Sequence, residues 1–316
     1  MPRPSRHAAP ILVAALALAG PAVAGDCWAP TRARPVTGAG DALGKPIYAR
    51  LKGATEAAER MLRGDPRLNA IPNVRYQANR SVTLPVVEGG AFTASAWVGL
   101  HAPKVWGPGC TLDQGRADYL TPASVTLSFN TPGDVAHALP SPPNEGGPAV
   151  FPLSPRDAET FERTGVIAYN NAAVRLYRAG GRRAIVPFRV RDHLAFWEAE
   201  LQRISADGGA EIADPQLAGL RARRAALSPA ELDAQAAISA ATSGESLWAY
   251  AVVGAPDASP LYQIAPDLMR PVADKGAVQV VVAEYSIAEP QAAPEAGLRA
   301  WLDALDLSPL DAFLAR

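Results

Sequence analysis

The strongest constraint on the fold comes from three strand-like segments that are separated by very short connections. They span residues 166–169, 173–178 and 184–190. Asn170 with Asn171, and Gly180 with Gly181, lie at the two connections, and these residue types tolerate the positive φ angles of tight turns. Short turns join antiparallel neighbours, because a parallel pair needs a long crossover. The pattern therefore predicts a three-strand antiparallel meander.

Amphipathic helices are expected on both sides of this meander. Asp192 is placed to cap a helix that runs to about residue 206, and its apolar residues recur at steps of three and four: Leu194, Trp197, Leu201 and Ile204. Ser228, Pro229 and Glu231 form a capping-box pattern, which predicts a helix from there to about residue 241. The same periodicity predicts further helices at 47–63, 215–226 and 295–305.

Alternating or continuous apolar runs predict the remaining strands at 81–87, 91–101, 124–130, 247–253 and 277–285. Strands grouped in hairpins, with helices between the groups, are typical of α+β proteins rather than of an alternating parallel sheet. We therefore expect an α+β fold in which antiparallel strands, as hairpins and a three-strand meander, pack with amphipathic helices.

A segment rich in Pro and Gly, residues 131–155, interrupts this pattern. Loops of this length are usually functional or act as linkers. A boundary near residue 145 would give an N-terminal α+β region, 25–145, and a C-terminal α+β region, 146–316. The alternative is one continuous domain, 25–316.

The first 24 residues have the three parts of a secretory signal peptide. Arg3 and Arg6 precede an apolar run, and Ala22, Val23 and Ala24 provide a small-x-small cleavage site. The run is shorter than the roughly 20 residues that span a bilayer, so an uncleaved anchor is the weaker alternative. No later segment is long and apolar enough to cross a membrane. Together with few Lys and many Ala, Arg, Gly and Pro, this favours a bacterial protein that is periplasmic or secreted.

The sequence contains two cysteines, Cys27 and Cys110. In an oxidising compartment an even pair favours a disulfide. Metal binding is the weaker alternative, because no C-x-x-C motif or nearby His completes a ligand set.

Charge and motifs exclude several classes of function. Lys and Arg number 30 against 31 Asp and Glu, so the chain lacks the basic excess of a general nucleic-acid binder. His101, His137 and His193 show no metal-ligand spacing, and neither a nucleophile elbow nor a phosphate-binding Gly-rich loop occurs. We predict no metal site and no cofactor, and no catalytic residue can be assigned from motifs.

One cluster of residues predicts an anion-binding site. Arg189 and Arg191 lie where a strand leads into a helix, with His193 in the first turn and Asn170 on the neighbouring hairpin. Helix N-termini and Arg both favour carboxylate or phosphate. Arg182 and Arg183 precede the same strand. The alternative is that these Arg form surface ion pairs with Asp192, Glu198 or Glu200.

These observations favour a non-catalytic binding or interaction module of the bacterial envelope, with a small anionic ligand or an envelope protein as partner. The alternative is a periplasmic or secreted hydrolase whose site assembles around His193 or His101 with an acid such as Glu198 or Asp192. A third interpretation is a subunit of a secreted complex that uses the 131–155 loop as its contact.

Overall fold

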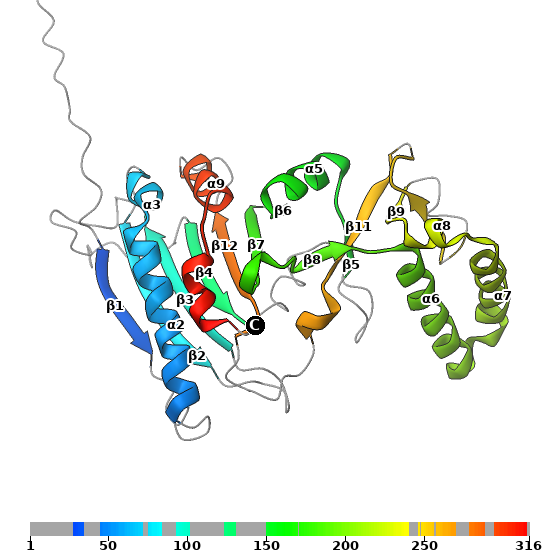
Figure 1. Ribbon diagram of the computed structural model, residues 1–316, viewed down its shortest axis with the longest axis horizontal. Coiled ribbons are helices and arrows are strands. Elements are labelled where there is room, and N and C mark those ends of the chain that lie inside the picture. Colours follow the sequence, from blue (N-terminus) through cyan, green and yellow to red (C-terminus); the bar gives the residue numbers. More distant parts are fainter. Residues whose placement is uncertain are drawn as a thin grey trace, which may run out of the picture.

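The computed structural model describes residues 28–34, 45–71, 75–83, 93–101, 123–130, 150–169, 171–239, 246, 248–255, 257–269, 278–287 and 294–314. Within these residues the chain forms two β-sheets with helices packed on them (Figure 1). The α+β class with antiparallel strands is thereby confirmed.

The first sheet has seven strands in the described part of the chain, in the order β1-β2-β3-β4-β12-β7-β6. Neighbours are antiparallel except β1 and β2, which are parallel. The strands are β1 (Trp28–Arg34), β2 (Arg75–Thr83), β3 (Thr93–His101), β4 (Ala123–Phe129), β6 (Val166–Tyr169), β7 (Ala172–Tyr177) and β12 (Val281–Ile287).

Helices cover one face of this sheet. They are α2 (Lys45–Gly64), α3 (Pro66–Ala70), α9 (Glu295–Asp303) and the short 3-10 helix η7 (Ser308–Phe313). Their apolar stripes meet the inward side chains of the strands, and Leu51, Leu62, Phe129 and Trp301 are fully buried there. The predicted helices at 47–63 and 295–305 are confirmed in these elements.

The second sheet has the order β10-β9-β11-β5 among the described strands, and β8 also pairs with β11. Its strands are β5 (Val150–Pro152), β8 (Ile185–Pro187), β9 (Ala236–Ile238), β10 (Ala251–Val252) and β11 (Ser259–Ile264). A second core forms between this sheet, helix α5 (Pro155–Thr164) and the first sheet, and it includes Phe161, Val174, Ile185 and Val282.

The remaining helices form a third cluster around Leu194, Leu201 and Leu220. They are α6 (Val190–Ile204), the π-helical turn η5 (Ser205–Gly209), α7 (Ala210–Ala226) and α8 (Pro229–Asp233). Two 3-10 turns, η4 (Ala179–Gly181) and η6 (Pro266–Met269), complete the described elements.

The predicted meander is wrong in its third strand. β6 and β7 form the expected hairpin, but β8 leaves the first sheet and pairs with β11 in the second. Gly180 and Gly181 do adopt positive φ angles, 67° and 69°. They turn the chain away from β7, and Pro187, which cannot donate to a ladder, suits a strand that pairs on one side.

Two helix boundaries also differ from the prediction. α6 begins at Val190, and Asp192 lies in its first turn instead of capping it. The Ser228 capping box is confirmed, but α8 ends at Asp233. The following Ala236 and Ala237 are fully buried in β9, so tertiary packing overrides the helix propensity of alanine.

Strand β12 joins the two predicted regions. Val281 pairs with Phe129 of β4 on one side and with Tyr177 of β7 on the other. One sheet therefore runs across the boundary near residue 145, while the division into 25–145 and 146–316 stays a prediction. The segment 1–24, Cys27 and Cys110 lie outside the described residues. Among the helices that are described, none has both the length and the apolar character needed to cross a bilayer.

Candidate functional site

Arg189 and Arg191 are brought together at one carboxylate. Arg189 Nη1 donates to Asp233 Oδ1 at 3.0 Å, and Arg191 forms an ion pair with the same carboxylate. Asp233 is the last residue of α8. The expected surface pairing therefore exists, but with a different acid. Glu198 binds Arg221 and Arg224, and Glu200 binds Arg203.

His193 does not join these arginines. Its side chain is 5% exposed, its ring packs edge-on against Phe188 and Tyr250, and Nε2 lies 3.1 Å from the Trp248 carbonyl oxygen. A carbonyl only accepts, so the neutral ring carries its proton on Nε2. Burial lowers the pKa of His193, and the bond to Trp248 offsets part of this effect. Asn170, the fourth predicted residue, lies outside the described residues.

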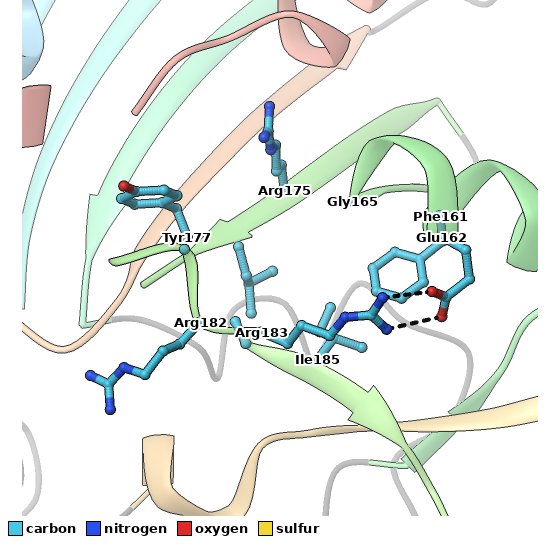
Figure 2. Close-up of a pocket in the computed structure, with 11 residues that line it drawn as sticks. Phe161, Glu162, Gly165, Arg175, Tyr177, Arg182, Arg183 and Ile185 are labelled. Atoms are coloured by element: carbon cyan, nitrogen blue, oxygen red, sulfur yellow. Dashed lines mark hydrogen bonds and ion pairs between the residues drawn. The ribbon is translucent and has the colours of Figure 1, made fainter. Parts of the chain in front are cut away.

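A pocket of about 200 Å³ lies between the two sheets (Figure 2). We call it the arginine pocket. Its lining residues come from α5, β7, η4 and the segment that leads into β8: Phe161, Glu162, Gly165, Arg175, Leu176, Tyr177, Gly181, Arg182, Arg183, Ala184 and Ile185.

The chain path explains why this space exists. α5 ends at Gly165, which adopts the left-handed conformation with φ 70°, and β6 begins at the next residue. Val166 pairs with Arg175, so β7 extends past the start of β6 by Leu176 and Tyr177. η4 then directs the chain into the second sheet. The pocket lies beside this overhanging end of β7, where side chains from both faces of the strand reach it.

The lining of the pocket carries more positive than negative side chains. Arg183 forms a bidentate pair with Glu162, at 3.3 and 2.9 Å. Arg175 Nη1 donates to the neutral Leu305 carbonyl at 2.8 Å, and Arg182 Nε reaches the Ala179 carbonyl at 3.5 Å. Neither Arg175 nor Arg182 forms an ion pair within 4.0 Å among the described residues. Asp306 and Asp267 nevertheless lie close enough to interact electrostatically with Arg175 and Arg182, respectively. Figure 2 shows these two side chains extending in different directions.

Tyr177 forms the remaining polar wall. Its hydroxyl donates to Asp311 Oδ1 at 2.9 Å. Burial, followed by this hydrogen bond, raises the pKa of Tyr177 to about 12. The phenol is therefore neutral at pH 7, and its proton is donated to Asp311. Tyr177 shapes the pocket but has no free hydroxyl proton to donate to an anion.

The arrangement favours binding of a small anion. Guanidinium groups donate to carboxylates and phosphates with matching geometry, and the lining carries three Arg against one acid. Within the described ranges, no group of three or more His, Cys, Asp or Glu is arranged to hold a metal ion.

The sequence pointed to Arg182 and Arg183 but not to Glu162, Arg175 or Tyr177. Arg175 and Tyr177 are two residues apart in β7, a spacing that places both side chains on the same face of the strand. Only the divergence of β7 and β8 brings that strand next to α5 and η4. Comparisons of the chain with protein-family models, with curated proteins and with solved structures gave no match.

Proposed function

We propose that the protein is a non-catalytic binding module of the bacterial envelope that holds a small anionic ligand in the arginine pocket. The observation that carries the proposal is Arg175, a half-buried guanidinium with one hydrogen bond to a neutral carbonyl and no carboxylate within 4.0 Å among the described residues. A charge that is partly removed from water is stabilised by an ionic partner. An anion in the pocket would supply that partner.

The envelope location rests on the sequence of residues 1–24. The geometry at His193 gives the hydrolase alternative no support, because its Nε2 is occupied by the Trp248 carbonyl and aromatic rings flank it. The other candidate base, His101, belongs to the part of β3 whose side chains lie outside the described set.

Thermal unfolding of residues 25–316 tests the proposal. Acetate and phosphate are each added at constant ionic strength, with chloride as the reference. At ten times Kd, a ligand that binds only the native state stabilises it by about 1.4 kcal/mol, which raises Tm by roughly 2 °C in a chain of this size. We expect Arg175→Gln to abolish this rise.

The double variant Arg189→Gln/Arg191→Gln is the matched control, because it removes two positive charges outside the pocket. We expect it to keep the wild-type response. An equal response in all three proteins would refute the pocket. Loss of the response only in the double variant would move the site to Asp233 and its two arginines.

A further inference from the structure

His193 of α6 holds a surface segment against the helices, in an arrangement that is independent of the arginine pocket. α6 and α7 lie at the end of the structure opposite to α2 (Figure 1). Nε2 of His193 donates to the Trp248 carbonyl at 3.1 Å, and the ring packs edge-on against Tyr250, with centroids 5.8 Å apart. Both contacts come from residues 248–252, which we call the aromatic flap.

The rest of the attachment of the aromatic flap is weak. β10 pairs with β9 through two residues and lies at the end of its sheet, and Val252 of β10 is 46% exposed. The Trp248 ring lies over Gly219 of α7, where an added Cβ would be 3.4 Å from Cζ2. Its buried Nε1 has no partner among the described residues. The contacts with His193 are therefore a large part of what holds the flap.

The other side of His193 is firmly packed. Val190 and Leu194 of α6 are fully buried, and Phe188, just before the helix, is nearly so. Trp248 and Tyr250 are only half-buried against the same cluster. Segments with few buried contacts open at the lowest free energy. If water is to reach the His193 ring, the flap therefore opens and α6 stays in place.

The surroundings of the ring offer no negative charge. Phe188, Tyr250 and the Trp248 carbonyl pack on it. Tyr250 is the titratable group among these three, and phenols are uncharged in acid. No carboxylate lies within 4.0 Å of the His193 ring among the described residues.

The charged groups at this end of α6 are engaged elsewhere or point away. Asp192 precedes His193 in the helix, and consecutive helical residues do not face each other. Arg189 and Arg191 are both bound by Asp233 of α8. A positive charge on His193 would thus have no ionic partner in the described part of the chain.

Protonation of His193 therefore favours an open flap. An imidazolium has two N–H donors, and only Nε2 has an acceptor among the described residues, the Trp248 carbonyl. Burial lowers the pKa of the closed ring, and the bond to Trp248 offsets part of this effect. Opening admits water and restores the ordinary pKa near 6.5. The open state therefore binds the proton more tightly, and acid shifts the equilibrium towards it.

We propose that His193 makes the aromatic flap a pH-sensitive latch, which is closed at neutral pH and opens in mild acid. Opening uncovers the side chains of Trp248, Tyr250 and Phe188. Acid would thereby create an apolar surface that the protein keeps covered at pH 7.

Hydrogen exchange of residues 25–316, followed by mass spectrometry between pH 7.5 and pH 5, tests this proposal. Rates are corrected for the intrinsic pH dependence of amide exchange. A proton that binds only the open state raises the opening equilibrium by up to about thirtyfold over this range. We expect the protection of the flap amides to fall by up to this factor.

Low concentrations of urea separate opening of the flap from global unfolding. A local opening exposes little surface, so its exchange does not depend on urea, whereas exchange through global unfolding does. We expect flap amides to be insensitive to urea at pH 5, and β12 amides to be more protected and sensitive to urea. Flap protection that is the same at both pH values, or that follows urea as β12 does, would overturn the proposal.

Two variants assign the response to His193. The amide of His193→Gln donates to the Trp248 carbonyl but does not titrate, so we expect the pH dependence of flap protection to disappear. Asp233→Asn is the matched control, because it removes the carboxylate bound by Arg189 and Arg191, and it should respond like the wild type. An unchanged pH dependence in His193→Gln, or its loss in Asp233→Asn alone, would refute the role of His193. If His193→Gln does not fold, the wild-type profile decides, since one proton gives a slope approaching tenfold per pH unit below about 6.5, and a flat profile above pH 5 contradicts the latch.

Discussion

Replacing Asp267 with Asn is expected to destabilise the protein, because Asp267 is the ionic partner of a buried guanidinium. Arg178 follows β7, and its side chain is 8% exposed, against 49% for Asp267 on η6. Arg178 Nη1 and Nη2 both donate to the carboxylate, and Nη1 also reaches the Arg183 carbonyl at 3.3 Å. Its buried Nε has no partner among the described residues. The pair therefore ties the end of β7 to the second sheet.

The magnitude follows from the exposure of the two partners. Hydrogen bonds to charged groups contribute about 1.5–3 kcal/mol, and water at the half-exposed Asp267 screens part of this. Asn keeps one acceptor oxygen. We expect Asp267→Asn to lower the free energy of unfolding by about 1–2 kcal/mol. The matched control is Asp257→Asn, since Asp257 is exposed, has φ 54° that Asn tolerates, and forms no ion pair among the described residues. It is expected to change stability by less than about 0.5 kcal/mol.

Urea unfolding from pH 7 down to pH 3 is the assay. Hydrogen bonds from Arg178 are the main cause that lowers the pKa of Asp267. Its contribution is therefore complete above the ordinary Asp pKa and is lost as the pH falls through the lower native value. The gap between wild type and Asp267→Asn should shrink in acid. Equal stability of the Asp267 and Asp257 variants at pH 7, or a gap that does not change with pH, would refute this reasoning.

Three other predictions concern stability. Burial lowers the pKa of His193, so on acidification the unfolded chain binds a proton at a higher pH than the native protein does. The free energy of unfolding therefore falls as the pH drops below about 6.5. In urea titrations between pH 7.5 and 5, this fall should be smaller for His193→Gln than for the wild type. Ser228→Ala removes a capping box and should cost about 1 kcal/mol in the same assay, whereas no loss would show that α8 frays already. Trp301 is fully buried and its Nε1 has no partner among the described residues; Trp301→Ala should cost about 3–5 kcal/mol and Trp301→Phe much less, and equal losses would contradict a packing role.

Local patterns predicted much of the secondary structure. The period of Leu51, Ala54, Ala58 and Leu62 placed α2 nearly to its ends, and the Ser228 capping box placed the start of α8. The chain from 93 to 101 is a strand that pairs antiparallel with β2, as its alternation indicated. Helix periodicity, capping boxes and strand alternation each depend on residues that are close in the sequence, so they can be predicted from a single segment of the chain.

Pairing between strands that are far apart in the sequence could not be predicted from local patterns. β11 begins with Ser259 and Pro260, which look like a turn, yet Pro260 pairs with Ala237 and Tyr262 with Pro187. The short connection after Tyr177 indicated a hairpin, and only the competing pairing with β11 explains why β8 changes sheets. The arginine pocket follows from that change, which is why Arg175 and Glu162 could not be joined from sequence alone.

The most direct test of the pocket is a crystal structure of residues 25–316 soaked with 5-bromopentanoate, whose bromine is located by anomalous scattering. We expect one bromine peak in the arginine pocket, with the carboxylate on Arg175. Bromine bound elsewhere, for example at Asp233 between Arg189 and Arg191, with the arginine pocket filled only by water, would contradict it.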